Sequence, residues 1–194
     1  MQNSQPAAIV IRFRVPGGER LGDLFINTFT TMDQPQAKSL IQNAVTGDRP
    51  QRWADLGCGA GTFTLALNSI LPAGSHLTAV DKQAQNLSVD FIKAGFEKDK
   101  LPLSGPDGIL LANSIHYVRG KQQLIKKLEP LFADGPVFLI VEYDTTRFSP
   151  RVPYPINYQK LQRLFTELGY RSITKLTELP SRFGGSMYSA LIRL

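Results

Sequence analysis

Stretches with strand character alternate with stretches of helical character from residue 52 to the end of this 194-residue chain. The expected strands are residues 52–56, 76–80, 89–96, 108–112, 136–143, 172–178 and 186–194. The expected helices are residues 62–71, 121–132 and 158–168, with a brief helical stretch starting at Lys82. Such alternation predicts a parallel sheet with helices on both faces. Because no helix separates the last two strands, we expect a three-layer α/β sandwich with a mostly parallel seven-stranded sheet whose last strand is antiparallel.

The first 49 residues follow a different pattern. Residues 7–15 predict a short strand, and Asp33 is placed to cap a helix over residues 35–45. We expect an N-terminal segment over residues 1–49 and a main domain over residues 50–194. The segment could form a lid, an oligomer arm or a part of the sheet. The sequence does not give the oligomeric state.

Charge and cysteine content narrow the class of protein. The chain has 22 basic and 16 acidic side chains, a net charge of +6. The densest basic cluster, residues 121–127, falls on an expected helix with an apolar stripe, which is the ordinary pattern of a solvated face, so a nucleic-acid partner is not favoured. The single cysteine, Cys58, excludes an internal disulfide. There is neither an apolar run of the ~20 residues needed to cross a bilayer nor a secretory signal, so we expect a cytoplasmic protein without a membrane anchor.

A glycine-rich loop lies between the first main-domain strand and the following helix. It reads Asp55-Leu56-Gly57-Cys58-Gly59-Ala60-Gly61-Thr62. In a doubly wound sheet this junction is where nucleotide-like ligands bind, and glycines let the backbone turn sharply and approach a ligand. The spacing is G-x-G-x-G and not the G-x-G-x-x-G of dinucleotide sites, because Thr62 stands at the third glycine position. Asp55 would repel a pyrophosphate but suits a cationic ligand.

This loop resembles motif I of class I S-adenosylmethionine (SAM) dependent methyltransferases, and the resemblance extends from about residue 52 to the C-terminus. It implies SAM as the cofactor, with Asp55 attracting the methionine ammonium. Asp81 follows the loop by about 20 residues, a spacing at which an acid reaches a ribose diol. Cys58 is expected to be a small packing residue of the loop. The expected cofactor-binding residues are Asp55, Gly57, Cys58, Gly59, Gly61, Thr62, Asp81, Lys82, Phe96, Asn113 and Ser114.

Two features depart from the family pattern. Gly95 stands where the family commonly has an acid near the adenine amino group, and Asp99 follows four residues later. The crossover from Asp81 to Phe91 is shorter than the dozen or so residues that a parallel crossover usually takes. Either the crossover helix is vestigial or the strand lies elsewhere. A catalytically silent SAM-fold binding module is therefore one alternative function.

The fourth expected strand runs into Asn113-Ser114-Ile115-His116. In the family this junction lies beside the sulfonium, and many nucleic-acid and protein amine methyltransferases carry Asn/Asp-Pro-Pro-Tyr/Phe there. This chain lacks both prolines and looks more like the small-molecule branch, with oxygen, nitrogen or carbon as acceptor; an RNA or protein methyltransferase is the other alternative. The candidate catalytic residues are His116, as a base that titrates near neutral pH, and Asn113, beside the methyl group. A histidine that only packs against the strand end is an equally open interpretation.

A second polar cluster follows the fifth expected strand, where sites form in such sheets. The candidate substrate residues are Tyr117, Glu142, Asp144, Arg147, Tyr154 and Arg182. An arginine at this rim would favour a carboxylate or phosphate on the substrate, whereas an ordinary surface arginine in a connecting loop is the alternative. His76 and His116 have no metal-ligand spacing, so no metal is expected.

Overall fold

The chain divides into two compact units, Met1–Met32 and Asp33–Leu194. The computed structural model describes residues 10–13, 22–25, 32–181 and 184–194. In the first unit, β1 (Val10–Phe13) and β2 (Gly22–Phe25) form an antiparallel two-stranded sheet. β1 lies within the strand predicted over residues 7–15; the other residues of that prediction lie outside the described part of the chain.

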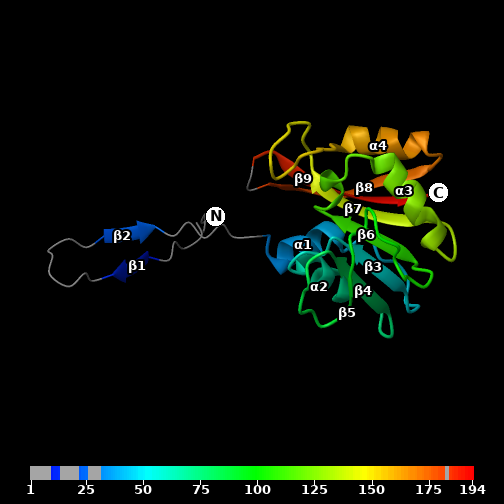
Figure 1. Cartoon of the computed structure of the whole chain (residues 1–194), viewed down its shortest axis with the longest axis horizontal. Coiled ribbons are helices and arrows are strands. Elements are labelled where there is room, and N and C mark those ends of the chain that lie inside the picture. The colour runs from blue at the N-terminus through cyan, green and yellow to red at the C-terminus, as the bar shows by residue number, and fades with distance from the viewer. Residues whose placement is uncertain (1–9, 14–21, 26–31, 182–183) are drawn as a thin grey trace. The chain divides into compact units, whose positions relative to one another are not determined.

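A seven-stranded sheet in the order β5-β4-β3-β6-β7-β9-β8 forms the centre of the second unit (Figure 1). Its strands are β3 (Arg52–Leu56), β4 (His76–Asp81), β5 (Asp90–Lys93), β6 (Gly108–Ala112), β7 (Val137–Tyr143), β8 (Ser172–Pro180) and β9 (Ser186–Arg193). The pairs among β3 to β7 are parallel, whereas β9 pairs antiparallel with both β7 and β8. The predicted sheet, mostly parallel with its last strand antiparallel, is confirmed.

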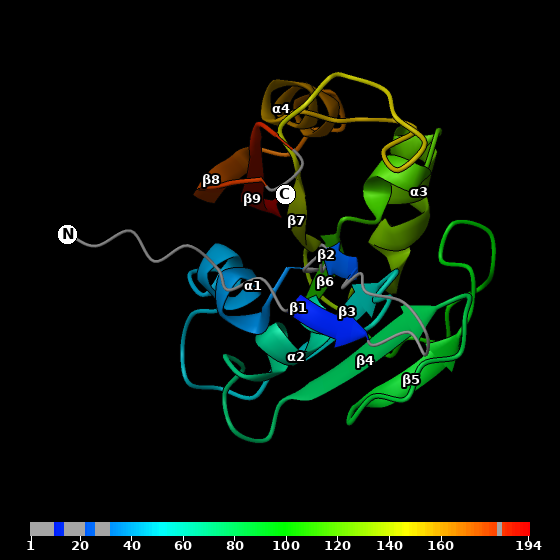
Figure 2. The ribbon, with the colours of Figure 1, turned by 90° about the vertical axis from the view of Figure 1, so that its left-hand side faces the viewer.

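Helices flank this sheet (Figures 1 and 2). α1 (Gln34–Ile41) packs against α2 (Thr62–Asn68), and α2 also contacts β4. α3 (Lys121–Leu128) and α4 (Tyr158–Glu167) place Leu124 and Phe165 in one apolar core with Leu111 of β6. Every residue of β6 is buried, as expected for a strand covered on both faces. The three-layer arrangement therefore agrees with the sequence pattern.

α1 is fastened to the sheet of the second unit. Asp33 caps it as predicted, since the Asp33 side chain accepts a hydrogen bond from Gln36 N at 2.9 Å. Ser189 of β9 donates its hydroxyl proton to the Leu40 carbonyl at 2.6 Å. The helix expected within residues 1–49 thus packs in the unit Asp33–Leu194.

The crossover between β4 and β5 differs from the prediction. The brief helix expected from Lys82 is wrong: residues 82–89 contain no helix, and β5 nevertheless pairs parallel with β4. A chain that must return along the sheet in so few residues has to be extended, because a helical residue advances only about 1.5 Å and an extended one about 3.3 Å. The strand predicted over residues 89–96 is therefore in the right place but shorter. Residues 94–107, between β5 and β6, also form no helix.

The helix predicted over residues 121–132 is divided. α3 ends at Leu128 and a 3-10 helix, Glu129–Leu131, follows. Pro130 has no backbone N–H to continue the α-helical ladder, which explains the change. Within the described ranges, no helix is both long and apolar enough to cross a bilayer.

Candidate active site

The glycine loop forms a tight bend at the carboxyl end of β3. Gly57, Gly59 and Gly61 have φ values of +80°, +50° and +84°, a region that disfavours residues with a Cβ. A Cβ on Gly57 would lie 2.7 Å from Ser114 Cβ and 3.0 Å from Phe96 Cε1, whereas a Cβ on Gly59 would meet nothing within 4 Å. The loop is therefore packed against its neighbours at Gly57 and open at Gly59. Thr62 is the first residue of α2, as the loop-to-helix pattern predicts.

Asp55 is a buried carboxyl group near the end of β3, directly before this bend. Thr64, in the first turn of α2, donates its hydroxyl proton to Asp55 Oδ2 at 2.6 Å, but Oδ1 is buried without a partner. Burial raises the pKa of Asp55 to about 7, opposed by the Thr64 hydrogen bond and reinforced by the negative charge of Asp81. A buried acceptor without a donor costs about 1–3 kcal/mol, so this oxygen is suited to a ligand that brings a donor.

Asp81 closes the loop from the end of β4. Its Oδ2 accepts the Gly59 N–H at 3.0 Å and its Oδ1 accepts the Gln83 N–H at 2.8 Å. A carboxylate has about four lone-pair sites, so each oxygen keeps capacity for a further donor such as a ligand hydroxyl. Cys58 lies between these groups, and its burial followed by the charges of Asp55 and Asp81 raises the pKa of its thiol to about 12. Cys58 thus remains a thiol, which does not favour a nucleophile.

The carboxyl end of β6 adds two more buried polar groups. Asn113 has a φ of +52°, the only positive value of a non-glycine residue in the described part of the chain. Its Oδ1 and the Oγ of Ser114 are both buried without a hydrogen-bond partner. Strained backbone at such a position is often held where a side chain must point to a ligand. The contact between Ser114 and the Gly57 position joins this end of β6 to the glycine loop.

His116 and Glu142 form a buried pair beside Ser114. His116 lies in the 3-10 helix Ile115–Tyr117, and its Nδ1 is 2.8 Å from Glu142 Oε2 of β7. Their side chains are 3% and 1% exposed, so solvent does not weaken the contact. Glu142 also accepts the backbone N–H of His116 at 3.2 Å and that of Tyr143 at 3.3 Å. His116 Nε2 is buried without a partner.

The unpartnered buried atoms gather in this one region. Among the residues that the structure describes, the buried side-chain nitrogen and oxygen atoms without a partner are Asp55 Oδ1, Asn113 Oδ1, Ser114 Oγ and His116 Nε2. Buried polar atoms in native proteins are nearly always hydrogen-bonded, and exceptions mark functional sites or missing ligands. All four belong to residues that the sequence pattern identified as candidates.

A turn from Phe96 to Asp99 forms another wall of the loop. Gly95 N donates to Asp99 Oδ2 at 2.7 Å, so the Asp99 carboxylate lies beside the residue where the family pattern expects an acid. Lys127 of α3 donates to the carbonyls of Phe96, Glu97 and Asp99 at 3.0, 3.1 and 2.6 Å. The half-buried Phe96 ring is thereby held against Gly57.

The remaining predicted residues divide between exposed and structural positions. Tyr117 and Tyr154 are exposed, and the Tyr154 N–H donates to the His116 carbonyl at 2.9 Å, so both flank the buried pair. Asp144 accepts the Tyr158 N–H at 2.9 Å, which anchors the start of α4. Lys82 and Arg147 are exposed on loops after β4 and β7. Arg182 lies outside the described residues.

Some residues of the site were not predicted from the sequence. Thr64 holds Asp55, and Leu87 packs so closely on Gly61 that a Cβ there would collide with its Cδ2. Half-buried Lys121 donates to the carbonyls of Val118 and Tyr154 at 2.8 and 2.7 Å, next to Glu142. A search for a hydroxyl one turn into the helix, facing a buried acid, would have found Thr64. The others depend on loop paths that no local pattern encodes.

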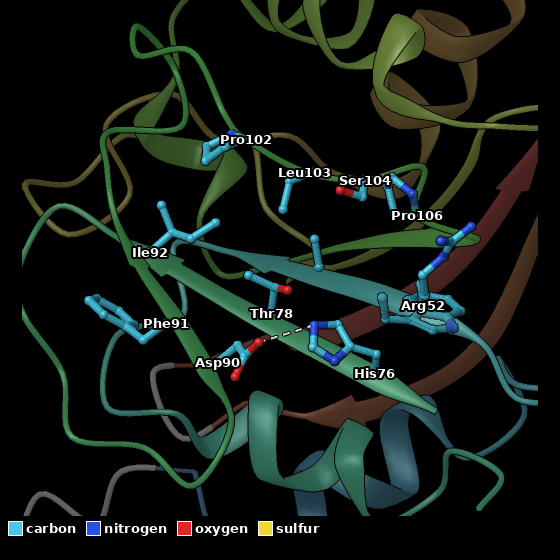
Figure 3. A pocket seen from close by; sticks show the side chains of 12 residues that line it. Arg52, His76, Thr78, Asp90, Phe91, Ile92, Pro102, Leu103, Ser104 and Pro106 are labelled. Atoms are coloured by element: carbon cyan, nitrogen blue, oxygen red, sulfur yellow. Dashed lines mark ion pairs between the residues drawn. The ribbon is translucent and has the colours of Figure 1, made fainter. Parts of the chain in front are cut away.

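A separate pocket of about 350 Å³ lies at the opposite ends of the strands (Figure 3). Arg52 and His76, the first residues of β3 and β4, line it together with Asp90, and His76 Nε2 is 3.3 Å from Asp90 Oδ2. Residues 102–106 border it where no crossover helix covers the sheet. None of the predicted site residues lines this pocket, so it is distinct from the candidate site at the glycine loop.

No protein-family model and no curated protein sequence matches the chain. Solved structures do match its fold. A SAM-dependent methyltransferase from Thermotoga maritima is 14% identical, with a TM-score of 0.63 over 82% of this chain and 88% of its own. Human N-acetylserotonin methyltransferase in complex with SAM is 21% identical, with a TM-score of 0.59 over 81% of this chain and 51% of its own. The CurJ carbon methyltransferase is 14% identical, with a TM-score of 0.63 over 80% of this chain, which spans only 53% of that protein's length.

These matches and the sheet order define the fold. The chain has the class I SAM-dependent methyltransferase fold. In this fold the sheet is mostly parallel, and here the antiparallel strand β9 lies between β7 and β8. The described residues contain no group of three or more His, Cys, Asp or Glu side chains that could hold a metal ion.

Proposed function

We propose that this protein is a SAM-dependent methyltransferase that acts on a small-molecule acceptor. The observation that carries the proposal is the cluster of unpartnered buried atoms on Asp55, Asn113 and Ser114 around Gly57, within the methyltransferase fold. Leaving these buried atoms without hydrogen bonds costs folding free energy. A ligand that brings its own donors and acceptors would explain why the protein keeps them.

The residues around the loop fit SAM in charge and shape. Asp55 and Asp81 supply negative charge next to the loop, which suits a ligand with an ammonium and a sulfonium group and disfavours a pyrophosphate. Gly59 leaves open space at the point where a backbone without a side chain can approach the cofactor. Asp55 would hold the ammonium and Asp81 the ribose hydroxyls, with Phe96 on the adenine side. SAM would supply an electrophilic methyl group on a good leaving group, so that placement contributes much of the rate.

The acceptor class rests on the segment after β6. Asn113-Ser114-Ile115-His116 lacks the paired prolines typical of many nucleic-acid and protein amine methyltransferases. The plantazolicin methyltransferase BpumL, 15% identical with a TM-score of 0.59, was solved with a pentazolic desmethyl analogue of plantazolicin. N-acetylserotonin methyltransferase is named for a small acceptor. These names support a small acceptor as a working proposal for this chain.

Calorimetry with SAM and S-adenosylhomocysteine tests the cofactor. We expect both to bind and NAD not to bind. Asp81→Ala should weaken binding at least about tenfold, the effect of a lost hydrogen bond to a charged group. Asp90→Ala is the matched control, because this exposed acid begins the neighbouring strand and lines the separate pocket. Binding of NAD with no binding of SAM or S-adenosylhomocysteine at millimolar concentration would contradict the proposal, and RNA binding that weakens steeply with salt would contradict a small acceptor.

A further inference from the structure

The His116–Glu142 pair has a chemical consequence for the acceptor. We infer, building on the proposed function, that the acceptor atom is one that must lose a proton, a conjugated hydroxyl or an activated carbon, that His116 Nε2 takes this proton, and that Glu142 is the positioning residue. The first support is the geometry of the pair, with His116 Nδ1 2.8 Å from Glu142 Oε2 and both side chains buried.

The direction of the hydrogen bond follows from the chemistry of the two groups. A carboxylate can only accept, so the proton of the His116–Glu142 contact resides on Nδ1. A neutral imidazole with its proton on Nδ1 has its lone pair on Nε2, which is the buried atom without a partner. Glu142 accepts in addition from two backbone N–H groups, and one of them belongs to His116 itself. The carboxylate thereby fixes both the tautomer and the position of the ring.

A buried base is needed for some acceptors and not for others. A neutral amine already presents a lone pair to the methyl group, so it gains little from a base before the transfer. A hydroxyl oxygen or an activated carbon becomes a good nucleophile only as its proton leaves. The buried, oriented and unpartnered Nε2 of His116 therefore favours an acceptor with a hydroxyl oxygen or an activated carbon.

The surroundings of the pair favour a flat acceptor. The ring of Tyr117 lies 4.3 Å from that of His116, and the ring of Tyr143 lies at 6.0 Å, measured between centroids. The exposed large hydrophobic residues in the described part of the chain are Tyr117, Phe148, Tyr154 and Leu194. Three of the four are aromatic; Tyr117 follows His116 directly, and Tyr154, which lies with Phe148 on the loop after β7, donates its N–H to the His116 carbonyl. Exposed aromatic faces beside a buried base suit a planar conjugated molecule such as a phenol or an enolised dicarbonyl compound.

The reaction balances with these groups alone and the proposed cofactor. The acceptor oxygen or carbon forms a bond to the methyl carbon, and the electron pair of the broken carbon–sulfur bond stays on sulfur. The acceptor proton moves to His116 Nε2, and the resulting imidazolium releases it to solvent after the product leaves. The charged and titratable groups around the His116–Glu142 pair include Tyr143 of β7, Tyr188 of β9, Tyr117 of the 3-10 helix, Lys121 of α3 and Arg151 of the loop after β7.

Model acceptors test the inference on the 194-residue chain. Phenol, acetylacetone and aniline are offered with SAM labelled on the methyl group, and the labelled products are identified. We expect label in anisole or in C-methylated acetylacetone, which separates the two acceptor kinds, and none in N-methylaniline. Label in N-methylaniline alone, or in none of the three products although calorimetry shows SAM binding, overturns the inference. Absence of SAM binding overturns the proposed function instead.

A second comparison separates a base from a structural histidine. His116→Asn keeps an amide N–H for Glu142 but has no atom at Nε2, so kcat for phenol should fall at least about 100-fold. With 4-nitrophenol, which ionises without help under mildly alkaline conditions, the same variant should lose far less. An equal loss for both phenols contradicts a role for His116 as base.

Nitrogen NMR of the cofactor-free protein shows which ring nitrogen of His116 carries the proton, independently of any activity measurement. The His116 ring should carry its proton on Nδ1 in the native protein. In Glu142→Gln the side-chain amide donates to Nδ1, so the proton should move to Nε2 and the activity with phenol should fall with it. A native ring protonated on Nε2 in mildly alkaline solution overturns the inference.

Discussion

Thr64 donates its hydroxyl proton to Asp55 at 2.6 Å and thereby joins the first turn of α2 to the end of β3 across the glycine loop. It is the one hydrogen bond that the structure gives the Asp55 carboxyl group, whose other oxygen is buried and unpartnered. The hydrogen bond lowers the pKa of Asp55, while the stronger effect of burial and the charge of Asp81 raise it to about 7. The charge of the candidate site at the glycine loop therefore changes near neutral pH.

Cofactor affinity should depend on pH through Asp55. An ammonium binds an ionised carboxylate more strongly than a neutral acid, and the free protein protonates Asp55 below a pKa of about 7. We expect SAM binding to weaken by up to about tenfold per pH unit below that value and to level off above it. Calorimetry across this range measures the slope, and Asp55→Asn should bind weakly at every pH. Thr64→Val should shift the midpoint to higher pH, and an unshifted midpoint would contradict the role of this hydrogen bond.

The same titration should appear in the stability of the cofactor-free protein. The folded-state pKa of Asp55, about 7, lies above the ordinary value of 3.8 for this side chain, so the folded protein binds this proton more tightly than the unfolded chain. Stability should therefore decrease as pH rises between those two values. Asp55→Asn removes this titration. The free energy of unfolding of the variant, relative to that of the native protein, should therefore increase as pH rises from about 4 to about 7. Urea denaturation at several pH values measures the difference, and a constant difference would refute the argument.

Gly59 and Gly47 offer a matched test of the open part of the loop. Both have a positive φ, +50° and +80°, and a Cβ on either would meet nothing within 4 Å. Each alanine substitution should cost about 1–2 kcal/mol of folding free energy, because a Cβ is disfavoured in the left-handed region. Only Gly59→Ala should also weaken binding of S-adenosylhomocysteine, since its Cβ would occupy the space that the ligand approaches. Equal affinities of the two variants would place the ligand elsewhere.

Much of the architecture follows from local sequence signals. The bounds of β3 and β6, the Asp33 cap and the antiparallel β9 were all predictable from apolar runs, a capping side chain and the absence of a helix before the last strand. The expected helix after β4 was wrong because the length of the connection, and not helix propensity, determines the path of residues 82–89.

The residues of the candidate site were easier to find than their partners. A short motif identifies Asp55, because its chemistry is set by neighbours in the chain. Glu142 was expected only as one member of a polar cluster, since its contact with His116 joins β7 to the segment after β6. Pairings of that kind depend on strand order and register, which emerge only when the sheet is assembled.

Lys127 connects α3 to the wall of the loop, and this connection gives the last test. It donates to the carbonyls of Phe96, Glu97 and Asp99, while Lys126 is exposed on the same helix. Lys127→Met keeps the apolar stem but loses the charged donor, so it should lower the free energy of unfolding by about 1.5–3 kcal/mol. Because Phe96 packs at Gly57, this variant should also bind S-adenosylhomocysteine more weakly. Lys126→Met should change neither quantity, and equal effects of the two substitutions in denaturation and calorimetry would show that the charge of α3 matters and the anchoring of the turn does not.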